Sequence, residues 1–289
     1  MIGIIGGTGL GEALGALGAG QKHTIDTPFG MPSGPIATTQ VAGVEVALLS
    51  RHGDGHLVNP SSVPFRANIF ALKTLGVTHI LASAAAGSLR ETIAPRDLVL
   101  PDQAVDKTFC RPNSFFDGMA VHVEMAEPFC PTLRSVLAKV GAGLPVKLHL
   151  KGTYVCMEGP QFSTRAESEL HRAWGADLIG MTLMPEAKLA REAEICYAAV
   201  ALATDYDCWR KRPGVEDKVH LLEEILANVK VATQNALGLI GRAIPQVAAL
   251  AAAPCACQSA LELAIWSDRQ LIPADVRQRL APITGKYLG

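Results

Sequence analysis

The chain has 289 residues, 49% of them hydrophobic, which is enough to bury a large core in one big domain or two small ones. Its 26 basic and 27 acidic residues give a net charge of −1 without any block of like charge, which argues against nucleic acid or an anionic membrane surface as a partner. No apolar stretch reaches the roughly 18 to 20 residues that are needed to span a bilayer.

The first predicted strand covers residues 1–5, and the turn Gly6-Gly7-Thr8-Gly9-Leu10 follows it. Such a turn lets backbone N–H groups approach a phosphate, and the Thr8 hydroxyl would add a donor; an ordinary tight turn fits equally well. Gly7-x-Gly9 also partly imitates a dinucleotide-binding fingerprint, but the third glycine of that pattern would fall at Glu12.

Arg51 and His52 stand at the end of the next predicted strand, 44–50. The guanidinium fork of Arg suits phosphate oxygens, and His can donate a second hydrogen bond. In an extended segment, His52, Asp54 and His56 would instead line one side as metal ligands, although Gly53 and Gly55 make this stretch turn-like.

A helix is expected over residues 65–75 and a strand over 78–83, which runs into Ala84-Ala85-Ala86-Gly87. Small residues at the end of a strand leave room for a ligand, and they equally allow close packing of a helix. A further strand is expected over 97–103. His122 lies in a loop, where a lone histidine is more often exposed or structural than functional.

The second half continues the alternation of strands and helices. Strands are expected over 152–157, 176–180 and 195–203, and helices over 164–174, 185–194, 219–243 and 274–280. Thr164 and Glu167 form a capping box, and Glu186 suits the amino end of its helix. This pattern predicts an α/β protein with a largely buried sheet.

Asp205 and Asp207 follow the apolar run 195–203, which predicts a buried strand. Residues i and i+2 of an extended chain point to the same side, so the two carboxylates would face one pocket. A solvated turn acid followed by a helix cap is the alternative.

The seven cysteines are scattered without paired metal-type spacing, and Cys255-Ala-Cys257 is too close and too isolated to count as a framework. No secretory signal is visible at the amino end. We therefore expect a cytoplasmic protein with reduced thiols and no bound metal.

Motifs spread over residues 2 to 245 resemble the 5'-methylthioadenosine phosphorylases of the trimeric purine nucleoside phosphorylase superfamily. They are Ile4-Ile-Gly-Gly-Thr-Gly-Leu10, Asp26-Thr-Pro-Phe-Gly30, Arg51-His-Gly53, Gly87-Ser-Leu-Arg-Glu91, Met125-Ala-Glu-Pro-Phe-Cys130, Glu158-Gly-Pro-x-Phe162, Arg165-Ala-Glu-Ser168, Trp174-Gly-Ala-Asp177, Met181-Thr182 and Ala203-Thr-Asp-Tyr-Asp-Cys-Trp209. The resemblance implies a single α/β domain with a mixed, twisted central sheet flanked by helices. It also implies a catalytic region over 1–245, a divergent, helical C-terminal extension over 246–289 packed on the same domain, and a homotrimer.

The implied reaction is phosphorolysis of 5'-methylthioadenosine to adenine and 5-methylthioribose-1-phosphate, with phosphate as co-substrate and no cofactor. The family's phosphate ligands match Thr8, Arg51, His52, Ala84, Ala85 and Thr182. The family usually has Thr at the position of Ala84, so weaker phosphate binding is expected here. Ser83 would point to the other side of a strand.

The resemblance also assigns the nucleoside contacts. Met181 would pack against the ribose and Phe162 beside the base, while Asp205, protonated, would give its proton to N7 and Asp207 would face the 6-amino group. Because 6-oxopurine members carry Asn at the position of Asp205, an aminopurine is expected. Substrate specificity would come from Ser163, Leu222, Ile225, Leu226 and His122 of a neighbouring subunit.

Alternative functions remain open. A broader purine nucleoside phosphorylase would also accept adenosine or 5'-methylthioinosine. A nicotinamide-dependent oxidoreductase would rest on Gly7-x-Gly9, and a non-catalytic purine-binding protein would have no need of the anion site at Arg51 and His52.

Overall fold

The computed structural model describes the chain except for residues 9, 11–19, 211–217, 251–252 and 289. The strands are β1 (Ile2–Gly6), β2 (Gln21–His23), β3 (Ile36–Val41), β4 (Val44–Ser50), β5 (His79–Ser88), β6 (Leu98–Val99), β7 (Gln103–Lys107), β8 (Leu148–His149), β9 (Thr153–Met157), β10 (Leu178–Gly180) and β11 (Cys196–Asp205). The helices are α2 (Phe65–Thr74), α3 (Pro131–Gly141), α4 (Arg165–Ala173), α5 (Leu183–Glu192), α6 (Lys218–Leu250) and α7 (Ala274–Leu288), with short 3-10 turns η1 (Asp54–His56), η2 (Pro60–Ser62), η3 (Ala256–Ser259) and η4 (Arg269–Leu271).

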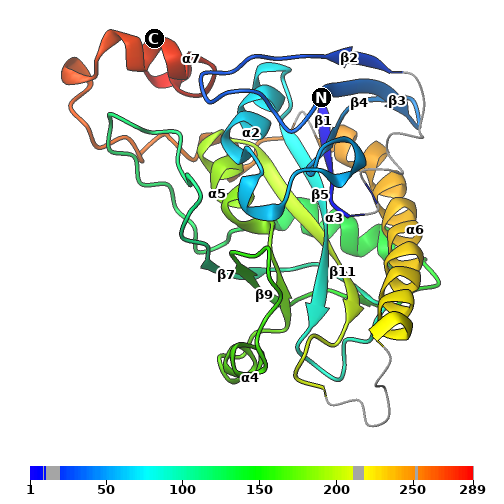
Figure 1. The fold of residues 1–289 in the computed structure, drawn as a ribbon. Coiled ribbons are helices and arrows are strands. Elements are labelled where there is room, and N and C mark those ends of the chain that lie inside the picture. Colours follow the sequence, from blue (N-terminus) through cyan, green and yellow to red (C-terminus); the bar gives the residue numbers. More distant parts are fainter. Residues whose placement is uncertain (9, 11–19, 211–217, 251–252, 289) are drawn as a thin grey trace.

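The described strands form one mixed sheet, in which β4, β1, β5 and β11 lie side by side and parallel (Figure 1). Antiparallel β2 and β3 extend it beyond β4, while β10 pairs antiparallel with β5 and continues into β9 and β7. The four parallel strands place their carboxyl ends at one edge, where ligands bind in open α/β sheets. This confirms the predicted fold class.

Alternate residues of the central strands face two helical layers. In β11, Tyr197 and Ala199 join the core under α2 and α5, whereas Ala198 and Val200 join the core under α3 and α6. Because both faces are covered, nine of the ten residues of β11 are buried, which explains the continuous apolar run from which the strand was predicted.

Several elements are longer than predicted because tertiary contacts extend them. β5 continues to Ser88 since β11 and β10 pair with its carboxyl half, so the small residues after 83 are strand and not turn. α6 continues through Pro245 to Leu250, and α7 likewise extends beyond 280 through Pro282. In the part of the chain that the structure describes, no helix is both long and apolar enough to cross a membrane.

The C-terminal segment packs on the same core as the rest of the chain. Leu261, Ile272 and Leu280 are buried within the cluster that lies under α2 and α5, and α7 contacts α2. Residue 245, where the likeness to the family was predicted to end, lies inside α6. The division into 1–245 and 246–289 stays a prediction.

Glu192 is a buried carboxyl at the end of α5, and its Oε2 accepts a hydrogen bond from Phe115 N at 2.8 Å. Burial raises the pKa of Glu192 from 4.5 to about 7. Because the folded state holds the Glu192 proton more tightly than the unfolded state, the protonated Glu192 contributes fully to the free energy of unfolding below pH 4.5. This contribution is lost as the pH rises through 7. Glu192→Gln cannot ionise, so it is expected to be more stable than the parent by about 3 kcal/mol above pH 8 and equal to it near pH 4.

Denaturant unfolding at both pH values measures this difference. Glu262→Gln, the same substitution on the exposed surface, is the matched control. A difference between Glu192→Gln and the parent that stays constant from pH 4 to 8 would contradict the prediction.

Candidate active site

The glycine-rich turn after β1 meets the end of β4 and the middle of β5. Arg51 N donates to Gly6 O at 2.9 Å, and Gly7 N donates to Ser83 Oγ at 3.2 Å. A methyl group on Gly7 would lie 2.8 Å from Arg51 Nη1 and 3.5 Å from Ala84 Cα, so only glycine allows this approach. The predicted anion residues Arg51 and Ala84 are therefore neighbours.

Arg51 is completely buried against a counter-ion on α5. Its Nε and Nη2 donate to the two carboxylate oxygens of Glu186 at 2.7 and 2.6 Å, and its Nη1 donates to Ser83 O at 2.7 Å. Three of the five N–H donors of Arg51 are thus engaged within the described residues, which leaves two for an anion. Tyr197 Oη also donates to Glu186, at 2.7 Å.

The role of Glu186 was not predicted from the sequence. An acid in the first turn of a helix is ordinary, and no local pattern distinguishes one that binds a buried Arg 135 residues away. Ser83 lies beside the glycine-rich turn: its hydroxyl oxygen accepts from Gly7 N, and its own hydrogen remains available to donate, so the expectation that it does not replace the hydroxyl missing at Ala84 stays a prediction.

His52 is buried, and its ring is held by Val58. Since Val58 O can only accept, Nδ1 of His52 carries the hydrogen and donates at 2.8 Å, which leaves Nε2 as an acceptor in the neutral ring. Burial and the charge of Arg51 lower the pKa of His52 to about 4. The sequence analysis predicted that His52 donates a hydrogen bond to phosphate. Nε2 can donate only when the ring is protonated, and a bound anion favours the protonated ring.

The segment after His52 is a turn and not an extended chain. Asp54–His56 forms η1, and the rings of His52 and His56 stack with centroids 4.2 Å apart. The alternation that would have placed His52, Asp54 and His56 on one side as metal ligands is therefore absent.

Met181 and Thr182 come alongside β5 because β10 runs antiparallel to it, with Ile179 opposite Gly87. Continuing that register brings them toward the level of Ala84 and Ala85. Thr182 is buried, whereas Thr8, at the end of β1, is exposed. The predicted phosphate ligands thus come from the ends of β1, β4 and β10 and from the middle of β5.

A buried network that was not predicted holds Met181. Arg111 Nη1 donates to Met181 O at 2.5 Å, and its Nε donates to Glu158 Oε1 at 3.0 Å. Gly159, with φ of +70°, approaches the Met181 side chain so closely that a Cβ there would lie 2.6 Å from Sδ. The resemblance marked Glu158 and Gly159 as part of a motif, but only the tertiary contacts show what they position.

Asp205 and Asp207 are adjacent, as predicted, but through a turn. Asp207 has a φ of +49°, and its backbone N donates to Asp205 Oδ1 at 2.7 Å. Thr204 Oγ1 donates to Asp205 Oδ2 at 2.7 Å. The extended geometry from which a shared side was inferred ends at Asp205, so the turn and not strand alternation brings the acids together.

Asp207 is the acid whose environment points to a ligand. Burial, and then the charge of Asp205, raise the pKa of Asp207. By hydrogen-bond geometry its Oδ2 is buried without a partner among the described residues, while the nearby hydroxyls of Ser168 and Ser163 offset part of the rise in its pKa. A buried carboxylate oxygen that lacks a partner is costly, so this atom suits a donor supplied by a ligand.

Three further residues, from β5, from α6 and from the loop before β6, surround the acid pair. A Cβ on Gly87 would lie 3.3 Å from Asp205 Oδ1 and 3.2 Å from Asp207 Cβ, so the bare backbone of β5 makes room for them. From α6, Asn228 Nδ2 donates to Thr204 O at 3.0 Å, and Arg96 Nε donates to Asn228 Oδ1 at 2.8 Å. Sequence reasoning did not single out Asn228, since a polar residue inside a long helix carries no signal of its own.

The predicted specificity residues are not enclosed within one chain. Phe162 is 85% exposed, and Leu222 and Leu226 are each 57% exposed. Ile225 is half-buried, as is Ser163, whose carbonyl accepts from Cys208 Sγ at 3.3 Å beside the acid pair. The roles of these side chains stay predictions.

His122 is exposed, and its loop is tied to the C-terminal segment. Its backbone N donates to Ala264 O at 2.9 Å, and its ring meets Trp266 edge-on at 4.6 Å. The role of His122 in a neighbouring subunit's site also stays a prediction.

Residues 1–245 match the family described as Phosphorylase superfamily, so the mixed sheet that carries Arg51 and the acid pair belongs to an enzyme of the phosphorylase class. An S-methyl-5'-thioadenosine phosphorylase from Gloeobacter violaceus is 45% identical over 99% of this chain and 95% of its own. The chain belongs to the S-methyl-5'-thioadenosine phosphorylase family.

Solved structures agree with this assignment. A methylthioadenosine phosphorylase from an antarctic soil metagenomic library superposes with a TM-score of 0.88, at 44% identity and with 98% of each chain covered. A mutant of an adenosine/methylthioadenosine phosphorylase from Schistosoma mansoni, in complex with methylthioadenosine, has a TM-score of 0.79, at 32% identity over 98% of this chain and 97% of its own.

Proposed function

We propose that the protein catalyses the phosphorolysis of S-methyl-5'-thioadenosine to adenine and 5-methylthioribose-1-phosphate. The observation that carries the proposal is the buried, unpartnered Asp207 Oδ2 among the described residues, held next to Asp205 at the same sheet edge as the Arg51 cradle. An acceptor for a 6-amino group and a site for phosphate are the two recognition elements that this reaction needs.

The acid pair would hold and pass the leaving-group proton. Two adjacent carboxylates resist double ionisation, and the pKa of Asp207 is raised by burial and by the charge of Asp205. A 6-amino group that donates to Asp207 Oδ2 would favour the ionised form of Asp207, and we assign the proton for N7 to Asp205. The bond from C1' to N9 then breaks, N7 takes the proton from Asp205, and adenine leaves neutral.

Phosphate is the nucleophile on the other side of the sugar. Its oxygen forms the new bond to C1', while Arg51 and the hydroxyls of Thr8 and Thr182 would bind its remaining oxygens. His52 would accept a hydrogen bond at Nε2 from a protonated phosphate oxygen, or donate one after phosphate has raised its proton affinity. Met181 would pack against the ribose.

One assay tests the proposal. Adenine release from S-methyl-5'-thioadenosine is followed spectroscopically with and without phosphate, and inosine and adenosine are added as competitors. Release that requires phosphate and is inhibited only weakly by inosine agrees with the proposal. No release, or release without phosphate, contradicts it.

Turnover of adenosine itself would define a broader specificity. The relative from Schistosoma mansoni is named an adenosine/methylthioadenosine phosphorylase, so this second possibility is tested directly with adenosine as the substrate. Comparable kcat/KM values for adenosine and S-methyl-5'-thioadenosine would establish it.

Ala84→Thr is expected to lower the phosphate KM by about five- to tenfold, because a hydroxyl at this position adds one hydrogen bond of about 1 kcal/mol to the cradle. Phosphate KM is measured at saturating nucleoside. Ala86→Thr is the matched control on the same strand, for which no such gain is expected. A phosphate KM for Ala84→Thr equal to or above that of the parent would show that the missing hydroxyl does not limit binding.

We also propose that the enzyme acts as a homotrimer in the cytoplasm and needs no cofactor. The exposed Phe162, Leu222 and Leu226 and the exposed loop of His122 support an assembly that covers them. Light scattering measures the oligomeric state. His122→Ala should raise the nucleoside KM without changing that state, and a monomer with full activity would refute the proposed assembly.

A further inference from the structure

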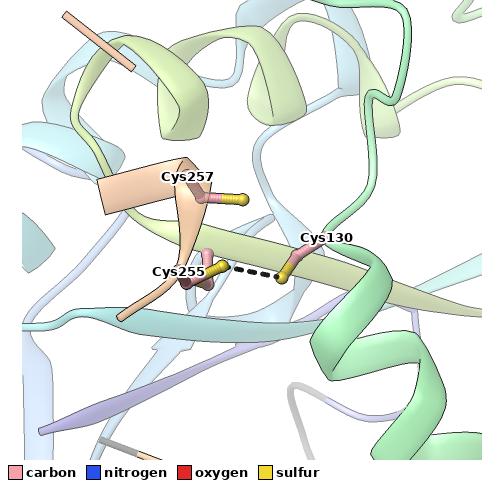
Figure 2. A group of neighbouring side chains, drawn as sticks. Cys130, Cys255 and Cys257 are labelled. Atoms are coloured by element: carbon pink, nitrogen blue, oxygen red, sulfur yellow. Dashed lines mark hydrogen bonds between the residues drawn. The ribbon is translucent and has the colours of Figure 1, made fainter. Parts of the chain in front are cut away.

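Four cysteines from three distant parts of the chain meet on the side of the sheet covered by α3 and α6. Cys130 precedes α3, Cys196 opens β11, Cys255 directly precedes η3, and Cys257 lies within η3. Figure 2 shows Cys255 and Cys257 facing Cys130 across a small gap. From the sequence, Cys255 and Cys257 were considered too close together and too isolated to form a framework; in the structure Cys255 meets Cys130, which is 125 residues away along the chain.

The spacing of the sulfur atoms fits a common metal ion. All four Sγ atoms lie within 4.8 Å of one another, and Cys130 Sγ is 3.7 Å from Cys255 Sγ. Zinc–sulfur bonds of about 2.3 Å at the corners of a tetrahedron place neighbouring sulfurs about 3.8 Å apart. A disulfide would instead need a sulfur–sulfur distance of about 2.0 Å, and all seven cysteines of the chain are free thiols.

The surroundings suit thiolate ligands. Cys130, Cys196 and Cys257 are buried and Cys255 is half-buried, so the cluster is largely shielded from bulk water. Cys130 stands at the N-terminus of an 11-residue helix, where the helix dipole favours a thiolate.

We propose that these four cysteines form a structural tetrathiolate site for Zn²⁺. A tetrahedral set of four sulfur ligands is typical of zinc, and a site with four protein ligands is closed and therefore structural. Binding replaces the thiol protons, which pass to solvent, with bonds to the metal.

The site lies far from the reaction. β11 has ten residues, so Cys196 at its start is about 30 Å from Asp205 at its end. The zinc ion would tie the C-terminal segment to the beginning of β11 and to α3. The same segment carries Ala264, whose carbonyl holds the loop of His122, so the metal would stabilise that loop at a distance from the chemistry.

Metal content tests the proposal. The protein is produced in zinc-supplemented medium and purified under reducing conditions. Gel filtration removes unbound metal, and inductively coupled plasma mass spectrometry then measures the zinc content. One zinc ion per chain is expected for the parent and for Cys110→Ser, the matched control with an exposed thiol outside the cluster. Cys257→Ser and the milder Cys255→Ser at a half-buried position are expected to lose the metal.

Thermal unfolding and thiol counting complete the test. Stripping zinc with a chelator should lower the Tm of the parent, zinc should restore it, and neither should move the Tm of Cys255→Ser. With zinc bound, the four thiols should resist alkylation that labels Cys110. The proposal is overturned if the parent carries no zinc under these conditions, if Cys255→Ser and Cys257→Ser retain it, or if mass analysis finds a disulfide within the cluster in place of the metal.

Discussion

Asp205→Asn is expected to lower kcat by about 10²- to 10⁴-fold, while the KM for S-methyl-5'-thioadenosine changes only a few-fold. The amide keeps the size of the carboxyl group and can still accept from Asp207 N, but it has no acidic proton to give to N7. Adenine would then have to leave as an anion. Steady-state kinetics at saturating phosphate separates the two parameters.

Asp207→Asn is the matched variant for this experiment. Asp207 Oδ2 lacks a partner among the described residues and is assigned to the 6-amino group, so its replacement should chiefly raise KM and weaken the preference for adenine over hypoxanthine nucleosides. Equal effects of Asp205→Asn on kcat and KM, or a larger loss of kcat in Asp207→Asn, would reverse the proposed roles of the two acids. Any residual activity of Asp205→Asn should shift toward 6-oxopurine nucleosides, because an amide can donate a hydrogen bond to an oxo group and an ionised carboxylate cannot.

Glu186→Gln is expected to reduce the free energy of unfolding by about 3 to 5 kcal/mol and to raise the phosphate KM. Arg51 is completely buried, and two of its nitrogens donate to the Glu186 carboxylate at 2.7 and 2.6 Å. Removing that charge leaves a guanidinium without its counter-ion inside the protein. The freed guanidinium also loses the orientation that presents its remaining donors to phosphate.

Chemical denaturation and phosphate titration measure the two effects. The control is Asp117→Asn, which breaks the ion pair of Arg66 and Asp117 at the surface, where a change of about 0 to 1 kcal/mol is expected. Tyr197→Phe removes only one hydrogen bond to Glu186 and is expected to reduce the free energy of unfolding by about 1 kcal/mol. This milder variant can be measured if Glu186→Gln does not fold. If Glu186→Gln reduces the free energy of unfolding no more than Asp117→Asn does, the buried ion pair of Arg51 and Glu186 does not stabilise the fold.

The two largest effects involve opposite ends of β11. Asp205 is the last residue of that strand, whereas Glu186 accepts a hydrogen bond from Tyr197 near its start and is paired with Arg51 after β4. If Arg51 binds phosphate as proposed, the carboxylate that neutralises its buried charge would also orient it toward the phosphate.

The sequence alone determined the fold class, the central strands and most helices. Strands buried on both faces appear as continuous apolar runs, and β1, β4 and β11 were predicted for that reason. The capping box at Thr164 and Glu167 forms as predicted, because its hydrogen bonds join residues three apart. The motifs that resemble methylthioadenosine phosphorylases indicated the family and the candidate ligands, because a short motif contains the side chains that a site needs.

Only the tertiary structure decided what those residues contact. The partner of Arg51 lies 135 residues away at Glu186, and the four clustered cysteines extend from Cys130 to Cys257. Asp207 reaches Asp205 through a turn with a positive φ, where strand alternation had predicted the same proximity for another reason. Local periodicity reports which face of an element is buried, but buried charges and thiols find partners through the topology of the sheet, which brings distant strand ends to one place.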